Sequence, residues 1–416
     1  MYNKTMNKIF DVVIIGGGPA GMMAGISAKK NWNHVCIVEK NSSLGKKMLL
    51  TGKGRCNLTT AKETAEIIDA FGKNGKFLYG ALSRFSNKNL MSFFEKRGVK
   101  LKTERGQRVF PESNKATDIL NCLENELKKK KVKIYFNSRV AKVVKEKNLF
   151  TVITNAKVIL GKKVIIATGG KSYPITGSSG DGYRLAKSLG HKIIKPSPAL
   201  VGLLVFDNDI KKLAGLSLKN VNLSFLTDDK VFAEGFGEML FTHRGISGPI
   251  ILRLSEKVDK KLSNKKKVRA EIDLKPRLDR ITLKKRVYRE IEQAPKKEYQ
   301  SLLKTLLPRL LIPYAVNITK IDKHVKNHLL SKEQIEELID FLKKFSFQIN
   351  KTAPLKTAIV TKGGINIKDV DSKSMESKIV ANLFFAGEII GLVGPTGGFN
   401  LQKAFSTGWV AGKFSS

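Results

Sequence analysis

The sequence predicts an α/β protein whose parallel sheet is built from both ends of the chain and is interrupted by an insertion. Three observations support this. An apolar run at 9–15 ends in glycines and precedes a helix-like segment and a second apolar run at 34–40. From about 191 the pattern changes to alternating strands and then to helices. After 358, short apolar runs and a glycine-rich loop return.

The composition is that of a globular protein of two or three domains, with 416 residues and 42% hydrophobic residues. No apolar run approaches about 18 residues, so we expect no membrane helix. The first ten residues lack the apolar core of a secretory signal. The three cysteines, Cys36, Cys56 and Cys122, form no C-x-x-C pair, which disfavours a disulfide scaffold or a structural zinc site. We therefore expect a reduced, soluble, cytoplasmic protein without a metal.

The net charge of +40 is unusual for an enzyme of this size. It comes from 76 Lys and Arg against 36 Asp and Glu, and it is spread over the chain rather than held in a tail. A polyanionic partner such as RNA, DNA or an anionic surface is one interpretation. The other is compositional drift toward lysine. Drift normally raises acidic residues as well, and here it has not.

A dinucleotide-binding motif follows the first apolar run. Gly16, Gly18 and Gly21 form G-x-G-x-x-G, and Glu39 lies at the end of the second run. The first glycine permits a tight turn, the second lets the backbone approach a pyrophosphate, and the third lets the helix pack closely on the sheet. The helix N-terminus favours phosphate, and Glu39 is suited to accept hydrogen bonds from ribose hydroxyls. The motif predicts a Rossmann-like domain.

Two later segments favour FAD over NAD. The strand 164–170, VIIATGG, ends in small residues, and the strand 383–388, LFFAGE, ends in a carboxylate suited to a ribityl hydroxyl. The glycines at 397–398 begin a final helix whose dipole would stabilise negative charge on a reduced flavin. No second G-x-G-x-x-G follows a strand, since GSSGDG at 177–182 has the wrong spacing. We therefore expect NAD(P)H to visit only transiently as reductant.

Longer blocks resemble the BaiN/YhiN-type FAD-dependent oxidoreductases, also called aminoacetone oxidase-like flavoproteins. These blocks are GKKMLLTGKGRCNLT (45–59), RVFPESNKA (108–116), IIATGGKSYPITGSSGDGY (165–183), FTHRGISGP (241–249) and the segment 363–412. The resemblance runs almost end to end. It implies an FAD domain split by a β-barrel and helical-bundle insertion. Some members of the family are linked to reduction of steroid enones and others to making dihydrouridine in ribosomal RNA.

We accordingly expect an FAD-binding domain at 1–190 and 358–416 and an inserted substrate domain at 191–357. The insertion is expected to be a β-barrel over about 191–280 and helical over about 281–350, with Ser331 and Gln334 forming a capping box. We expect the insertion to form one wall of the substrate cleft. The predicted cofactor-binding residues are Gly16, Gly18, Pro19, Ala20, Gly21, Glu39, Lys40, Lys47, Gly54, Arg55, Cys56, Val140, Thr168, Gly169, Gly170, Gly387, Glu388, Gly397, Gly398, Asn400 and Leu401.

Two residues are candidates for the catalytic proton donor. Cys56 lies in a glycine-rich loop expected near the flavin, and the alternative is a small packing residue. His243 is the second candidate, and the alternative is a structural histidine. Other residues are similarly open. Arg55 holds a phosphate or a carbonyl, or forms a surface salt bridge, and Tyr173 covers the flavin, donates a hydrogen bond or is structural. Asn400 caps the last helix or meets the flavin, two compatible roles, and 265–267 is an RNA contact or a solvated turn.

The favoured function is therefore reduction of a uridine in ribosomal RNA by an FAD enzyme that uses NAD(P)H. The alternative is an FAD-dependent reductase or oxidase of a small molecule, such as an enone or an amine. A third class is an RNA-binding flavoprotein with a structural cofactor, or a folate-dependent RNA methylase using FAD.

Overall fold

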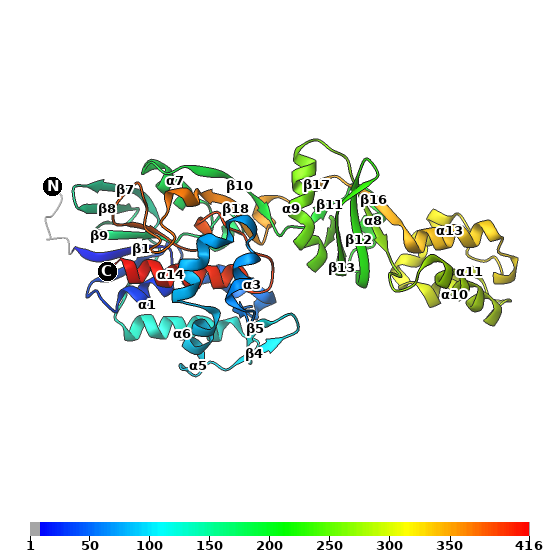
Figure 1. Ribbon diagram of the computed structural model, residues 1–416, viewed down its shortest axis with the longest axis horizontal. Helices are drawn as coiled ribbons and strands as arrows, with labels where there is room; N and C mark the ends of the chain where they lie inside the picture. Colours follow the sequence, from blue (N-terminus) through cyan, green and yellow to red (C-terminus); the bar gives the residue numbers. More distant parts are fainter. Residues whose placement is uncertain (1–8, 416) are drawn as a thin grey trace. The chain divides into compact units, whose positions relative to one another are not determined.

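A computed structural model describes residues 9–415 of the chain, which fold into two compact units (Figure 1). The first unit combines the N-terminal part up to Ala199 with the C-terminal part from Leu355. The second comprises Leu200–Pro354. Most of the decapeptide at the start of the chain, in which we expect no secretory signal, lies outside the described residues. No helix between residues 9 and 415 is both long and apolar enough to cross a membrane.

A seven-stranded sheet forms the core of the first unit, in the order β6-β2-β1-β9-β8-β7 with β19 also on β9. β1, β2, β6, β9 and β19 are parallel, whereas β7, β8 and β9 form an antiparallel meander. β1 is buried along its whole length, as its apolar sequence FDVVII predicts. The strands are β1 (Phe10–Ile15), β2 (Val35–Val38), β6 (Lys133–Tyr135), β7 (Val140–Glu146), β8 (Leu149–Thr154), β9 (Val158–Ile166) and β19 (Leu383–Phe385).

The first and last helices, α1 (Pro19–Ala28) and α14 (Phe399–Phe414), pack against each other (Figure 1). Their backbones approach unusually closely. A Cβ added to Gly408 would lie 2.2 Å from the Ala20 carbonyl oxygen, and one on Gly412 would lie 2.3 Å from that of Ala24. Because only glycine permits this approach, the C-terminal helix is fixed against the helix that begins the dinucleotide motif.

Two small sheets complete the first unit. Strands β3 (Thr59–Thr60), β5 (Arg108–Pro111) and β4 (Leu101–Glu104) form an antiparallel sheet, and β10 (Ile193–Ala199) pairs with β18 (Val360–Ile365). β4 and β5 form an antiparallel hairpin. The other helices are α2 (Lys46–Leu50), α3 (Thr64–Asp69), α4 (Tyr79–Arg84), α5 (Asn87–Glu95), α6 (Ala116–Lys129) and α7 (Asp181–Ser188).

An antiparallel sheet in the order β16-β15-β12-β13-β14-β11-β17 organises the second unit. The two ends of this order, β16 and β17, are separated in the chain by Asn350 alone, so one stretch of chain closes the sheet into a barrel. The strands are β11 (Leu203–Leu204), β12 (Ser217–Thr227), β13 (Lys230–Thr242), β14 (Gly245–Ser247), β15 (Val268–Asp273), β16 (Phe345–Ile349) and β17 (Lys351–Thr352). Helices α8 (Asn208–Lys212) and α9 (Pro249–Ser263) pack on β13.

Four helices complete this unit: α10 (Arg280–Gln293), α11 (Tyr299–Leu306), α12 (Ile312–Thr319) and α13 (Lys332–Lys343). They share one hydrophobic core with the barrel, joined by the aromatic rings of Phe241, Tyr314, Phe341 and Phe345. Ser331 caps α13, and its backbone N–H donates to Gln334 Oε1 at 3.0 Å, which confirms the predicted capping box.

The domain boundaries differ from those expected at 190/191 and 357/358. They lie at Ala199/Leu200 and Pro354/Leu355, because β10 pairs with β18 and belongs to the first unit. The helical part also ends earlier than expected: 345–349 is strand β16, not helix. Its alternating pattern FSFQI buries every second residue, a period of two that assigns it to the barrel.

Candidate cofactor-binding site

The dinucleotide loop joins β1 to α1 with the geometry that its glycines predict. Gly16 has a φ of +106°, and a Cβ there would lie 2.6 Å from the Ala167 carbonyl oxygen. A Cβ on Gly21 would lie 1.9 Å from the Gly16 carbonyl oxygen, so the third glycine permits the helix to pack on the loop. A Cβ on Gly18 would meet no atom within 4 Å. The loop therefore presents bare backbone where a pyrophosphate is expected, directly before Pro19 and Ala20 of α1.

Glu39 ties the end of β2 to this loop. Its Oε2 accepts from Gly17 N at 2.7 Å, and its Oε1 accepts from Asn41 N and Nδ2, both at 2.8 Å. The carboxylate is buried, with 7% of the residue exposed, and therefore occupies a fixed place beside the glycines. Its position after the second strand is the one that an adenosine ribose requires.

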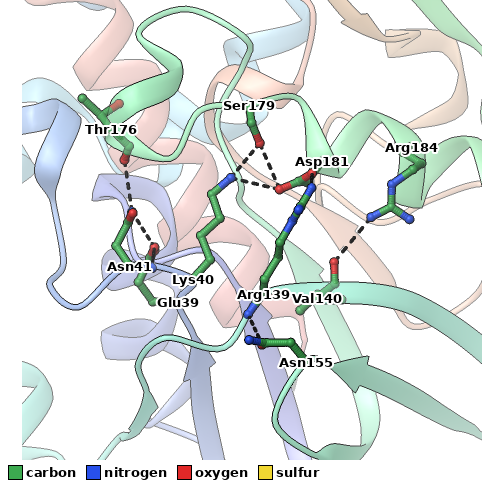
Figure 2. A network of polar contacts seen from close by, with 10 residues as sticks. All are labelled: Glu39, Lys40, Asn41, Arg139, Val140, Asn155, Thr176, Ser179, Asp181 and Arg184. Atoms are coloured by element: carbon green, nitrogen blue, oxygen red, sulfur yellow. Dashed lines mark hydrogen bonds and ion pairs between the residues drawn. The ribbon is translucent and has the colours of Figure 1, made fainter.

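A charged network extends from Lys40 to Ser179 and to Asp181 at the start of α7 (Figure 2). Lys40 Nζ donates to Ser179 Oγ at 2.6 Å and to Asp181 Oδ2 at 2.9 Å, while Arg139 donates to the other Asp181 oxygen at 2.9 Å. Burial raises the pKa of Asp181, but the hydrogen bonds from Arg139 and Lys40 outweigh it and hold the pKa well below its ordinary value.

Val140 begins β7 next to this network. Its side chain is buried, and its carbonyl oxygen accepts a long hydrogen bond from Arg184 Nη2 at 3.5 Å. Glu39 and Lys40, which are adjacent in the chain, and the distant Val140 are three predicted cofactor residues. They are linked through Asn41, Thr176 and α7 (Figure 2).

A second polar cluster joins the ends of β9 and β19. Lys47 Nζ donates to Glu388 Oε2 at 2.7 Å and to Ser172 Oγ at 2.6 Å, and Thr361 N donates to Glu388 Oε1 at 2.8 Å. Burial raises the pKa of Glu388, but Lys47 and these hydrogen bonds prevail, so its pKa lies below its ordinary value. A Cβ on Gly170 would lie 2.6 Å from Glu388 Oε1, which requires a glycine there.

Positive backbone angles shape the neighbouring turns. Gly169 has a φ of +73°, and Gly387 has a φ of +84° with its N–H donating to Thr407 Oγ1 at 2.9 Å. Thr168, between β9 and Gly169, has a buried Oγ1 with no hydrogen-bond partner among residues 9–415.

The loop before α14 is held by two residues of that helix. Asn400 Oδ1 accepts from Gly394 N at 2.9 Å, and its Nδ2 donates to the Gly394 and Pro395 carbonyls. The N-cap position is occupied by Gly398, so Asn400 braces the loop rather than capping the helix. Lys403, one turn later, is 1% exposed and donates to the carbonyls of Ile390 and Leu392. Gly397 and Leu401 flank this arrangement and are partly buried.

The 51–56 loop carries the other predicted residues. Gly54 has a φ of +85°, and Cys56, with a φ of +61°, is fully buried. Burial raises the pKa of the Cys56 thiol to about 12, so it keeps its proton at neutral pH. Arg55 forms the salt bridge that the sequence left open, with Nη1 2.8 Å from Glu104 Oε1.

His243 lies in the second unit, exposed in the turn between β13 and β14. Residues 265–267 form an exposed turn after α9, where Lys266 pairs with Asp228 at 3.3 Å. Tyr173 precedes a 3-10 turn with a φ of +51° and is partly buried. Cys36 and Cys122 are buried core residues of β2 and α6. No group of three or more potential ligands placed to hold a metal occurs within residues 9–415.

Sequence reasoning missed several polar residues of the site, above all Ser172, Asp181, Thr361 and Lys403. Lys403 had a detectable signal, since it is a lysine within an otherwise small and apolar stretch, LQKAFSTG. Thr361 had no such signal in the sequence, because its hydrogen bond to Glu388 forms only when folding brings β18 next to that carboxylate.

The residues present fit a bound FAD. The bare backbone at Gly18 suits the pyrophosphate, Glu39 suits the ribose, and the unpartnered Thr168 Oγ1 offers a hydrogen-bonding group. Tyr183, in α7, adds a second buried oxygen without a partner among the described residues. When bound, FAD would supply the hydride-transfer chemistry of the reaction.

Comparisons with known proteins show what the chain is similar to. The family model described as HI0933-like protein Rossmann domain matches residues 10–414. A 3-dehydro-bile acid delta(4,6)-reductase of Clostridium scindens is 33% identical over 98% of both chains. A ribosomal RNA dihydrouridine synthase of Haemophilus influenzae is 31% identical over 97% of this chain and 98% of the relative. A flavocytochrome c3 fumarate reductase structure has the same fold, with a TM-score of 0.53 at 18% identity, covering 98% of this chain and 78% of its own.

Proposed function

Because the chain belongs to the HI0933-like family and is an FAD-dependent oxidoreductase, we propose that it reduces a uridine of ribosomal RNA to dihydrouridine. NAD(P)H is the proposed electron source. The similarity to a ribosomal RNA dihydrouridine synthase over nearly the whole of both chains supports this substrate. We place the reaction in the cytoplasm, where ribosomal RNA and NAD(P)H are both present.

The net charge of +40 carries the RNA proposal. A protein that neutralises RNA phosphates with lysine and arginine gains affinity by releasing counterions, and a small neutral substrate gives no such gain. The excess of positive charge also destabilises the folded state, because like charges repel one another in a compact chain. A polyanionic substrate explains why the excess is retained.

The proposed reaction saturates the C5–C6 double bond of the pyrimidine. When bound and reduced by NAD(P)H, FAD would supply the hydride for C6. A side-chain acid of the chain would supply the proton for C5. The uridine must be unstacked, because a base inside a helix is out of reach of a protein-bound ring. The chain's tasks are therefore to hold the RNA, present the base and deliver the proton.

Cys56 and His243 are the proposed proton donors. Cys56 lies in the loop expected beside the flavin and remains a thiol at neutral pH, although the buried side chain needs a movement of the 51–56 loop to meet a substrate. His243 is exposed and accessible. Accessibility thus supports His243, and position in the cofactor unit supports Cys56.

The test is mass spectrometry of ribosomal RNA from a strain that lacks this gene, followed by addition of the purified protein. We expect a dihydrouridine to be absent from the deletion strain and to return when protein-free ribosomal RNA is incubated with the FAD-loaded protein and NADPH. If the deletion strain keeps every dihydrouridine, or the wild-type RNA contains none, the RNA proposal is wrong.

Reduction of a small enone is the second candidate. The 33% identity to the bile acid reductase, similar to that with the RNA enzyme, favours it. Salt discriminates between the two candidates. Turnover of an RNA substrate falls steeply between 50 and 200 mM salt, by about three orders of magnitude in affinity for roughly six phosphate contacts, whereas binding of an uncharged enone changes little.

A further inference from the structure

One face of the β4–β5 hairpin carries an excess of positive charge. The register places Glu104 opposite Arg108 and Lys102 opposite Phe110. Because side chains alternate along a strand, these four residues share one face. Arg55 lies over the same face: its Cζ is 4.2 Å from the centroid of the Phe110 ring, and its Nη1 is 2.8 Å from Glu104 Oε1.

A single carboxylate serves three cations on this face. Arg55 bonds it directly, while Arg108 Nη2 lies 3.8 Å and Lys102 Nζ 4.0 Å from the Glu104 oxygens. Arg108 is held through its Nε, which donates to the Arg105 carbonyl at 3.0 Å. In the part of the chain that the structure describes, its two terminal nitrogens have no acceptor at hydrogen-bond distance. They form an oriented, partly exposed pair of donors that matches two phosphate oxygens.

The hairpin face borders the loop that begins α14. A Cβ on Gly397 would lie 3.9 Å from Arg108 Cγ. A Cβ on Gly398 would lie 2.3 Å from the Thr59 carbonyl, and Thr59 pairs with Val109 of the hairpin. The charged face thus adjoins the turn where the cofactor's redox-active ring is expected, within the first unit alone.

We propose that Arg55, Arg108 and Lys102 form a phosphate-binding subsite for the backbone of single-stranded RNA. It holds the strand next to the nucleotide that is presented to the cofactor. The proposal rests on the proposed function and adds a location and a recognition chemistry to it. Arg108 supplies the bidentate contact, Lys102 adds charge, and the Phe110 ring holds the Arg55 guanidinium against the hairpin.

The test measures binding of a fluorescein-labelled oligouridylate to the FAD-loaded full chain over a series of salt concentrations. Arg108→Gln is the test variant, and Arg84→Gln, an exposed arginine on α4, is the control with the same loss of charge. We expect R108Q to bind several-fold more weakly and to reduce the salt slope by about 0.7, the value for one lost contact to a single strand. R84Q should bind like the wild type. Flavin absorbance and the melting temperature check that each variant is folded and loaded.

A second variant distinguishes ligand binding from a structural role. Glu104→Gln removes the only carboxylate among the three cations, so a phosphate-binding face should gain affinity several-fold. A face whose salt bridge serves only the fold should instead lose stability without that gain. Unchanged binding in R108Q, or weaker binding in E104Q, overturns the assignment.

Phosphates of NAD(P)H are the other source of the same chemistry. A raised KM for NADPH in R108Q, with oligouridylate affinity unchanged, would assign the face to the dinucleotide and overturn the RNA subsite. Wild-type protein that fails to bind oligouridylate and forms no dihydrouridine in ribosomal RNA would refute the proposed function. Wild-type protein that does both, with R108Q equal to R84Q, would refute only this subsite.

Discussion

The Lys47 ammonium and the Glu388 carboxylate lie 2.7 Å apart although 341 residues separate them in the chain. Lys47 belongs to α2 and Glu388 follows β19, so the pair links the N-terminal and C-terminal parts of the first unit. Ser172 and Thr361 complete the hydrogen bonding of the carboxylate. The Lys47 ammonium thus holds the Glu388 carboxylate in place, and we expect this carboxylate to face the cofactor.

Replacement of Glu388 by Gln should therefore destabilise the protein and weaken FAD binding. The free energy of unfolding should fall by about 2 kcal/mol. Breaking a fully buried ion pair costs about 3–5 kcal/mol, and the cost here is smaller because both side chains retain some exposure. Since the folded pKa of Glu388 is lowered, the loss is complete above the ordinary carboxyl pKa and shrinks as pH falls through the folded pKa. Urea unfolding at pH 7 and pH 4 measures it. Glu66→Gln, which breaks the exposed Lys62–Glu66 pair, is the control and should change little.

Gly18→Val should abolish FAD binding and leave the fold intact. A side chain there meets no protein atom, and the residue's φ of −79° suits any amino acid, but the valine occupies the space in front of the loop backbone. We expect a colourless protein that melts at the temperature of wild-type apo-protein. Gly21→Val is the contrasting variant: it clashes with the Gly16 carbonyl and should lower the melting temperature itself. Bound FAD in purified G18V would contradict the assignment of the loop.

Because of Lys403, the free energy of unfolding should change with pH in the alkaline range. Burial lowers its pKa to about 8 from 10.5 in the unfolded chain, so between these values the unfolded state binds more protons than the folded state. Stability conferred through this group therefore rises with pH over that window, by at most about 3 kcal/mol. Lys403→Met should lack the rise. Unfolding free energies at pH 7, 8.5 and 10 measure it, with the exposed Lys187→Met as control. Parallel pH curves for K403M and wild type would contradict the prediction.

Cys56→Ala and His243→Asn should separate the two candidate acids. Loss of the general acid should slow dihydrouridine formation by about 10²-fold or more while flavin reduction by NADPH continues. The measurements are stopped-flow bleaching of the flavin and mass spectrometry of the RNA product. A normal rate in C56A with a slow rate in H243N assigns the proton to His243, and the reverse assigns it to Cys56. If both variants keep the normal rate, neither residue is the acid.

Local patterns were sufficient for much of this fold. The apolar run of β1, the three glycines after it and the carboxylate of Glu39 occur within 30 residues, and each has a geometric role that depends on its immediate neighbours. The capping box at Ser331 is equally local, because a side chain there contacts a backbone group three residues away. Such features can be predicted from the sequence because the interacting groups are close to one another along the chain.

Features that needed distant contacts were misjudged or left open. The strand β10 seemed part of the insertion until its pairing with β18 assigned it to the first unit. Asn400, next to a helix start, was expected to cap the helix, but the path of the preceding loop made it a brace for Gly394; its expected contact with the flavin stays a prediction. Arg55 acquired its partner only when the β4–β5 hairpin brought Glu104 to it.

The sequence by itself determined the dinucleotide loop, the buried strand that precedes it, and the excess of positive charge. Only the tertiary structure decided which charges are paired. It bonded Lys47 to Glu388, buried Lys403 against two carbonyls, and placed Arg108 beside Gly397 with its Nη2 3.8 Å from Glu104. The physical reason is that steric demands on the backbone act between neighbours along the chain, whereas the energy of a charge depends on every group that folding brings within a few ångströms of it.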